Sequence, residues 1–175
     1  MKKILVASLV ISLLASPAFA ADSGGYVAVD LQNWSTTNNA PMGNPKMGVR
    51  IGGGYRFTPN VGVEVDYGQS GSSSTTGGMS YKVSATQLAV VGTYPINPMF
   101  DVFGKVGMSA NKATTTGTTC NSCSKTSVMF GVGGQYNINQ QLGVRLQYEN
   151  LGKVTNSGSD DLSATTLSLG VVYGF

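Results

Sequence analysis

The fold is decided by the stretch GGQYNINQQLGVRLQYE, residues 133–149. Its second half has an apolar residue at every other position: Leu142, Val144, Leu146 and Tyr148 alternate with Gly143, Arg145, Gln147 and Glu149. A period of two residues is typical of a β-strand whose two faces meet different surroundings. The polar segment 137–141 interrupts the alternation and is rich in Asn and Gln, which predicts a tight turn. The stretch therefore predicts an antiparallel hairpin.

The same pattern recurs along the chain. A short turn containing Pro or Asn again lies between alternating runs in GGGYRFTPNVGVEVDY (52–67) and in VVGTYPINPMFDVFGKV (90–106). We expect eight strands, over residues 26–34, 48–57, 61–68, 81–94, 99–109, 126–136, 142–149 and 166–175. The chain holds 24 glycines, too many for a largely helical protein.

The predicted connections alternate in length. Those at 58–60, 95–98 and 137–141 are tight turns. The other connections, at about 35–46, 69–80, 110–125 and 150–162, are longer and rich in Ser, Thr, Asn and Gly. Short turns at one end and long loops at the other are typical of outer-membrane barrels.

The positions of the aromatic residues indicate which face of the strands is exposed to water and which to lipid. Alternation alone also fits a soluble β-sandwich or a lipocalin, whose apolar face points inward. If the strands run alternately up and down, one aromatic band falls at the turn end and comprises Tyr55, Phe57, Tyr94, Phe100, Tyr136, Tyr173 and Phe175. A second band, of Tyr67, Tyr81 and Tyr148, falls at the loop end. Two such bands are typical of a membrane-spanning protein, so we expect an all-β fold: a closed, antiparallel, eight-stranded transmembrane meander barrel.

The N-terminus predicts export. Lys2 and Lys3 precede an apolar run over 4–15, and Ala18-Phe19-Ala20 matches the small-x-small pattern that signal peptidase reads. The run is too short for a membrane-spanning helix, which needs about 20 residues. We therefore expect residues 1–20 to be a cleaved signal peptide and residues 21–175 to form the barrel domain, located in the outer membrane.

Composition argues against several classes of function. Without Lys2 and Lys3, nine of the eleven basic residues remain against eight acidic ones, which gives no case for a nucleic-acid partner. Histidine is absent, and this removes Ser-His-Asp and Cys-His nucleophiles and all His-ligated metal sites. Glu64 and Asp66 share a strand face, but balanced basic partners favour salt bridges over acid–base chemistry. We expect no enzyme activity, cofactor or metal.

Charged residues inside the strands fall on the face opposite the apolar one. They are Asp30, Arg50, Arg56, Glu64, Asp66, Asp101, Lys105, Arg145 and Glu149. An eight-stranded barrel has an interior that side chains fill, so these charges must pair. We expect an ion-pair network of Asp30, Arg50, Glu64, Asp66, Lys105, Arg145 and Glu149 that plugs the lumen. An alternative is a gate, in which Glu64 exchanges between Arg145 and Lys105.

Two cysteines, Cys120 and Cys123, lie in the third long connection. A CxxC pair is a redox motif where it opens a helix beside a βαβ unit, which is not predicted here. Two thiolates alone also make a poor zinc site. Behind a secretion signal, a local disulfide between Cys120 and Cys123 is the favoured interpretation.

Three segments carry a family resemblance: TQLAVVGTYPINPMFDVFGKVG (86–107), GGQYNINQQLGVRLQYENLG (133–152) and LSLGVVYGF (167–175). In them the chain resembles the eight-stranded transmembrane domain of outer-membrane protein A and its small opacity-type and surface-protein relatives. The resemblance implies that the barrel-insertion machinery recognises the last strand through its alternating apolar residues, with Tyr173 and Phe175 at its end. Many members continue into a peptidoglycan-binding domain, whereas this sequence ends at Phe175, so no cell-wall anchoring is expected from the resemblance.

The expected function is that of an integral outer-membrane protein with a structural, envelope-integrity and surface-exposed role. A low-conductance porin is the first alternative, because the resemblance implies that related barrels conduct ions feebly. A surface adhesin acting through the long loops is the second alternative. The loops have few large apolar anchors, mainly Met42 and Met79, so the sequence gives adhesion little support. The expected partners are the lipid bilayer, the barrel-insertion machinery, and host or environmental ligands of the loops.

Overall fold

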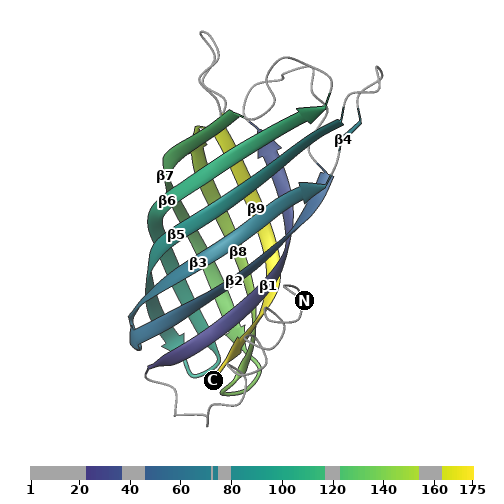
Figure 1. The fold of residues 1–175 in the computed structure, drawn as a ribbon. Helices are drawn as coiled ribbons and strands as arrows, with labels where there is room; N and C mark the ends of the chain where they lie inside the picture. Colours follow the sequence, from purple (N-terminus) through teal and green to yellow (C-terminus); the bar gives the residue numbers. More distant parts are fainter. Residues whose placement is uncertain (1–22, 37–45, 72, 75–79, 117–122, 154–162) are drawn as a thin grey trace, which may run out of the picture.

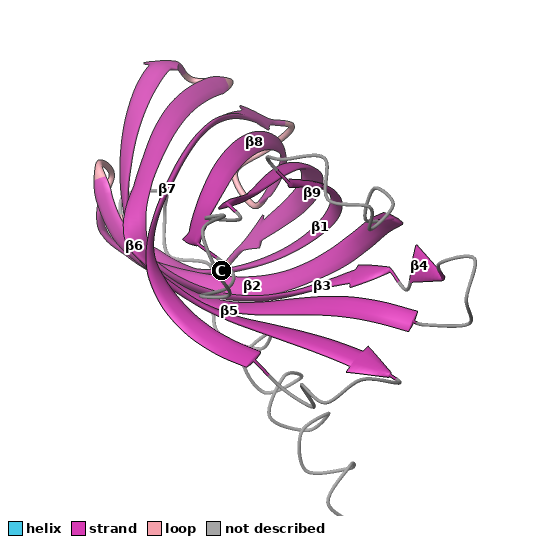
Figure 2. Cartoon of the chain, turned by 90° about the horizontal axis from the view of Figure 1, so that it is seen from above, coloured by secondary structure: helices cyan, strands magenta, loops and turns pink. Residues whose placement is uncertain are grey.

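The protein forms one β-sheet that curls and closes on itself (Figures 1 and 2). The computed structural model describes residues 23–36, 46–71, 73–74, 80–116, 123–153 and 163–175. Its strands are β1 (Gly24–Thr36), β2 (Lys46–Thr58), β3 (Val61–Gly71), β4 (Ser73–Ser74), β5 (Ser80–Asn97), β6 (Phe100–Thr116), β7 (Cys123–Asn137), β8 (Leu142–Lys153) and β9 (Ser163–Gly174). The predicted signal peptide and Cys120 lie outside the described residues.

Every pairing is antiparallel, and neighbouring strands follow one another in the sequence. Strand β3 pairs with β5, and the two-residue β4 also pairs with β5, so β3 and β4 act as one strand of the barrel. The barrel closes where β1 pairs with β9, from Tyr26–Gly174 to Thr36–Ala164. The prediction of an eight-stranded, all-antiparallel meander barrel is confirmed. Closure leaves no strand edge open to pair with another chain.

The strands are longer than predicted, and the connections correspondingly shorter. The loop predicted at 110–125 is wrong over its first part, because β6 continues to Thr116 and pairs there with Ser80 of β5. Threonine suits a pleated strand, and pairing satisfies backbone groups that a loop would leave to water. The turn predicted at 95–98 is also shorter, because Pro95 pairs with Asp101 and a register irregularity follows it.

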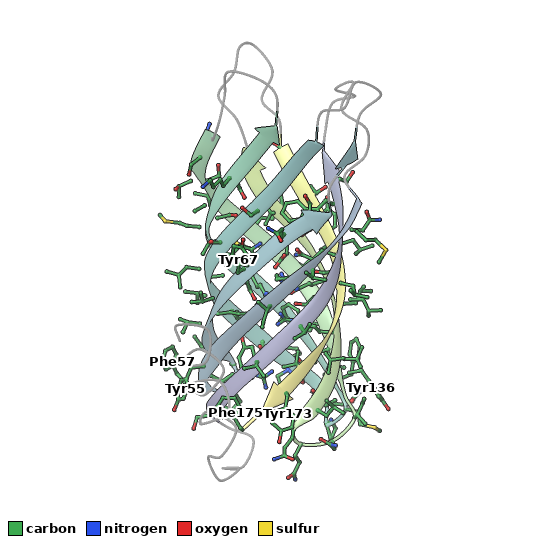
Figure 3. The ribbon with its side chains drawn as sticks, turned by 45° about the vertical axis from the view of Figure 1, so that its right-hand side comes forward. Tyr55, Phe57, Tyr67, Tyr136, Tyr173 and Phe175 are labelled. Carbon is green, nitrogen blue, oxygen red and sulfur yellow. The ribbon has the colours of Figure 1, made fainter. Side chains whose placement is uncertain are left out.

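The outer surface of the barrel is apolar. Strand residues pointing outward are 52–66% exposed: Val29, Val49, Ile51, Leu88, Val106, Val128, Leu146 and Leu169. Aromatic side chains gather at the turn end, where Figure 3 shows Tyr55, Phe57, Tyr136, Tyr173 and Phe175, while Tyr67 lies higher on the wall. The side chain of Tyr81 lies outside the described part. This apolar exterior suits contact with lipid. The distribution of apolar and charged residues is the reverse of that in a soluble protein.

Within the described ranges, no helix is long and apolar enough to cross a bilayer.

Candidate functional site

The inner face of the barrel has glycines where its charged side chains need room. A Cβ at Gly52 of β2 would overlap the carboxylate of Asp66 on β3. A Cβ at Gly170 of β9 would likewise overlap the carboxylate of Asp30 on β1. Small residues on these strands therefore allow carboxylates to reach across the lumen.

Seven charged residues meet in the middle of the lumen, and we call them the ion-pair layer. They come from five strands: Asp30 from β1, Arg50 from β2, Glu64 and Asp66 from β3, Lys105 from β6, and Arg145 and Glu149 from β8. All seven are at most 4% exposed. The layer contains three cations and four carboxylates, so each charge has opposite charges nearby. This is the set of residues for which the sequence predicted a network.

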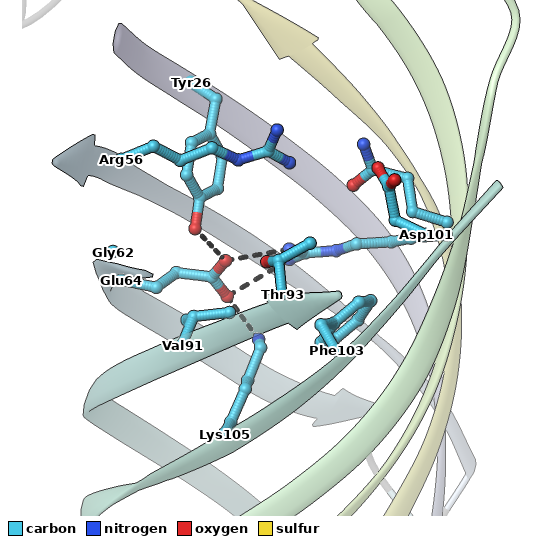
Figure 4. A pocket seen from close by; sticks show the side chains of 11 residues that line it. Tyr26, Arg56, Gly62, Glu64, Val91, Thr93, Asp101, Phe103 and Lys105 are labelled. Atoms are coloured by element: carbon cyan, nitrogen blue, oxygen red, sulfur yellow. Dashed lines mark hydrogen bonds and ion pairs between the residues drawn. The ribbon is translucent and has the colours of Figure 1, made fainter. Parts of the chain in front are cut away.

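Glu64 accepts from three side chains (Figure 4). Its Oε2 accepts hydrogen bonds from the Tyr26 hydroxyl at 2.7 Å and from Arg145 Nη1 at 2.8 Å. Its Oε1 accepts from Arg145 Nη2 at 3.3 Å and also receives Lys105 Nζ. The Glu64 carboxylate is thus shared by both cations that the gate hypothesis named.

Asp30 is held between two guanidinium groups. Arg50 donates to Asp30 Oδ2 from Nε at 2.9 Å and from Nη2 at 2.8 Å. Arg145 donates from Nε to Oδ1 and from Nη2 to Oδ2, both at 3.1 Å. Charge-assisted hydrogen bonds in pairs fix both distance and orientation, so Asp30 sets the positions of the two arginines.

Glu149 links the remaining cations. Its Oε2 accepts from Arg50 Nη1 at 2.6 Å and from the Thr166 hydroxyl at 3.3 Å, while its Oε1 lies 3.3 Å from Lys105 Nζ. Asp66 differs, because its carboxylate accepts no hydrogen bond from the described residues. It lies 3.7–4.0 Å from nitrogens of Lys105, Arg50 and Arg145. Asp66 therefore contacts the three cations only at distances longer than a hydrogen bond.

Sequence reasoning missed two hydroxyl donors to the layer, Tyr26 and Thr166. Both lie on the same inward alternation as Asp30 and Gly170, and this was the signal that could have found them. Two other inward charges lie outside the layer, towards the turn end. The Arg56 guanidinium lies 5.5 Å from the centre of the Tyr26 ring, and Asp101 accepts a hydrogen bond from Asn137 at 2.8 Å.

The lumen differs on the two sides of the ion-pair layer: a small cavity lies on one side and an apolar cluster on the other. Towards the turn end lies a cavity of about 20 Å³, bounded by Tyr26, Arg56, Glu64 and Phe103 among others, with room for about one water molecule. Towards the loop end lies a buried cluster that we call the apolar layer: Trp34, Val83, Ala85, Leu151 and Ala164. The lumen is therefore packed and does not form a wide aqueous channel in the described part.

The predicted disulfide lies in a part of the chain that the structure does not describe. Cys120 and the side chain of Cys123 lie outside the described residues, so the disulfide stays a prediction. In the part of the chain that the structure describes, no group of acidic or sulfur side chains is placed to hold a metal ion.

At the C-terminus, the Phe175 N–H donates to the Gly25 carbonyl at 2.9 Å, which ties the end of the chain to β1.

Comparison with known families gives a match over nearly the whole chain. The model for the outer membrane protein beta-barrel domain matches residues 6–175. Outer membrane protein A of Escherichia coli O157:H7 is 30% identical over 146 residues, covering 79% of this chain and 42% of that protein. Its counterpart in Klebsiella pneumoniae is 26% identical over 163 residues, covering 86% of this chain and 46% of that protein. The chain thus spans less than half the length of these relatives.

Solved structures show the same barrel. Neisserial surface protein A superposes with a TM-score of 0.67 at 20% identity, covering 87% of this chain and 99% of that one. Ail, the attachment invasion locus protein of Yersinia pestis, in complex with the heparin analogue sucrose octasulfate, gives 0.61 at 21% identity, covering 90% and 100%. The N-terminal β-barrel domain of Pseudomonas aeruginosa OprF gives 0.63 at 13% identity, covering 87% and 99%. At these identities the similarity concerns the fold.

Proposed function

The chain belongs to the outer membrane protein beta-barrel family, and from that membership we propose that it is a structural component of the outer membrane whose lumen is plugged. Its location is the outer membrane, as for its relatives. Envelope integrity is the role that we propose for it there. Because the match covers less than half the length of those relatives, their tasks outside the barrel are not transferred to this chain.

The observation that carries the proposal is the ion-pair layer. Hydrogen bonds and ion pairs join β1, β2, β3, β6, β8 and β9 across the lumen, and they leave no charged side chain of the layer exposed. A buried charge that loses its partner costs about 3–5 kcal/mol, so the layer resists opening. Enzyme activity is not part of the proposal, because histidine is absent and every carboxylate in the layer has a cation within 4.0 Å.

Planar-bilayer recording of the purified, folded protein tests the plug. We expect insertions without steady ionic current. A strain that lacks the protein should take up bile salts faster, and the wild-type gene should restore the barrier. Steady single-channel currents in most insertions would contradict a plugged lumen.

A low-conductance channel is the second candidate, and one observation favours it. Lys105 Nζ contacts both Glu64 and Glu149, and Arg145 contacts both Glu64 and Asp30. Each cation therefore has a second acceptor, so Glu64 could exchange partners without leaving a charge unpaired. Brief, rare openings that Glu64→Gln makes longer would favour this candidate over the plug.

The surface-exposed role rests on the distribution of lysine. Apart from Lys2, Lys3 and the buried Lys105, the lysines fall near the loop-end termini of strands: Lys46, Lys82, Lys112, Lys125 and Lys153. Such a basic rim suits an anionic surface ligand, and the solved Ail structure contains a sulfated heparin analogue. Retention of the folded protein on heparin, lost on replacing Lys82 and Lys112 by Gln, would support the role. Equal retention of both forms would count against it.

We also propose that the insertion machinery recognises β9. The strand has apolar outward residues at alternate positions and ends at Gly174, and Phe175 follows it. Deleting Phe175 should leave the protein in the periplasm, and cell fractionation would reveal this. Normal outer-membrane levels of the truncated protein would contradict the proposal.

A further inference from the structure

A groove lies on the outer surface of the barrel, towards the turn end, across β5 to β9. Its volume is about 890 Å³. Three glycines at outward positions form its floor: Gly92 of β5, Gly104 of β6 and Gly134 of β7. Gly92 and Gly104 are direct register partners, and Gly134 pairs with Val102 in the next row. The backbone is therefore bare at Gly92 and Gly104 on two adjacent strands, whereas a Cβ at Gly134 would lie 3.1 Å from the Phe100 ring, which also lines the groove.

At Gly92 and Gly104 the groove is a hollow, and packing does not require glycine there. A Cβ added at Gly92 would meet no atom within 4 Å, and one at Gly104 would meet only a backbone oxygen at 3.9 Å. Elsewhere in the barrel glycine makes room for a neighbour, as Gly52 does for Asp66. Above the floor, the outward neighbours Val90 and Val106 are 49% and 58% exposed, so the hollow interrupts a raised apolar surface.

The lining changes from apolar to polar along the groove. Val102, Val132 and Leu146 form its apolar walls. At the turn end lie Tyr94 and Tyr136, within the aromatic band, and the Asn60 amide, which donates to the Thr93 carbonyl at 3.0 Å. Tyrosine in such a band sits at the depth of lipid headgroups. The groove thus has the polarity of a membrane lipid, with the polar part at the turn end.

We propose that this groove binds an acyl chain of one phospholipid from the periplasmic leaflet. The groove is continuous with the lipid-facing belt, and the short turns of such barrels lie on the periplasmic side. A second copy of the barrel is a poor occupant, because a closed sheet offers no free strand edge that could enter the groove. An apolar chain can fill the floor, while its headgroup remains among the tyrosines and Asn60. This inference rests on the outer-membrane location and does not depend on a plugged lumen.

Native mass spectrometry of the detergent-purified barrel tests the proposal, with palmitoyl-oleoyl phosphatidylethanolamine as the added lipid. We expect the wild type to retain one lipid. The double variant Gly92→Leu with Gly104→Leu fills the floor and should lower the retained fraction at least about tenfold. Both side chains have space, and strands tolerate leucine better than glycine, so the variant should fold. Heat-modified gel mobility checks that it does.

Ala110→Leu is the matched control. Ala110 is an exposed outward residue on β6 near the loop end, outside the groove, and its change to leucine adds nearly as much apolar bulk as each single glycine replacement. This control should retain lipid as the wild type does. The proposal is overturned if the wild type retains no lipid, if the filled variant retains as much as the control, or if the wild type appears instead as a dimer that the filled variant abolishes.

Discussion

The ion-pair layer and the apolar layer close the same lumen by opposite chemistry. In the first, seven buried charges are bound to one another and to the hydroxyls of Tyr26 and Thr166. In the second, Trp34 and Leu151 pack with small aliphatic residues. Elsewhere in the lumen, the buried amides of Gln32, Gln87 and Gln147 make no hydrogen bond with the described residues. The comparison teaches that polar groups in one narrow barrel differ in what they contribute, depending on whether a partner is within reach.

The largest expected effect is at the centre of the ion-pair layer. Glu64→Gln removes the charge that Arg145 and Lys105 share, and breaking one side of a buried pair costs about 3–5 kcal/mol. We expect the free energy of unfolding to fall by that amount. Urea unfolding of the barrel in lipid vesicles, followed by the fluorescence of the single tryptophan, Trp34, would measure it.

A double-mutant cycle shows whether the layer acts as a unit. Glu64→Gln combined with Arg145→Gln should cost less than the sum of the two single losses, because both charges of the pair are removed together. Strict additivity would mean that Glu64 and Arg145 do not stabilise each other, and the layer would then be no more than a set of neighbours.

A smaller effect is expected in the apolar layer. Leu151 is fully buried, and Leu→Ala in a packed interior costs about 3 kcal/mol through lost burial and a residual cavity. Leu146→Ala is the control at an outward position of the same strand, β8, where the side chain is 52% exposed. If both changes cost the same in the urea assay, the apolar layer is not packed as a core.

The unpartnered amides should matter least for stability. Gln87→Leu replaces a buried amide that has no hydrogen-bond partner among the described residues. Because an unpaired buried polar group is itself costly, we expect a change of less than about 1 kcal/mol, or a gain in stability. A loss as large as that of Leu151→Ala in the same assay would show that the Gln87 amide is stabilising.

Because two layers close the lumen in series, we expect that disrupting only one of them leaves the ionic conductance unchanged. Glu64→Gln should leave the current in planar bilayers near baseline, since Trp34 and Leu151 still fill the lumen towards the loop end. Combining it with Trp34→Ala and Leu151→Ala opens both layers in series and should produce current. Conduction by Glu64→Gln alone would show that the ion-pair layer is the gate of a channel.

The alternation of residue types predicted which side chains enter the lumen. Arg145 and Glu64 could be assigned to the inner face because each lies between outward apolar residues. Their contact across 81 residues could not be read from the sequence, since it depends on the tilt and register of a closed barrel. Tyr26 was missed for a similar reason. An inward tyrosine has the alternation of a core residue, and only the three-dimensional structure shows that its hydroxyl reaches Glu64.

Strand ends and the outer groove lay beyond prediction for different reasons. Ser and Thr suit both loops and exposed strand ends. Composition therefore predicted that this strand ends at residue 109, whereas β6 continues to Thr116. The alternation places Gly92, Gly104 and Gly134 on the outer face. Their meeting in one hollow requires the pairing of Gly92 with Gly104, which no single strand reveals.

The seam between β1 and β9 constrains when this protein can fold. Residues near the two ends of the chain lie opposite each other, as Tyr26 does to Gly174, so the last strand to be translated completes the pairing of the first. Contacts between distant parts of a chain carry the largest loop-closure entropy and slow folding most. Until β9 arrives, β1 has an unpaired edge and an apolar face without lipid, which favours aggregation. A polypeptide with this topology is therefore protected from aggregation if it stays unfolded until β9 can pair with β1 in the bilayer.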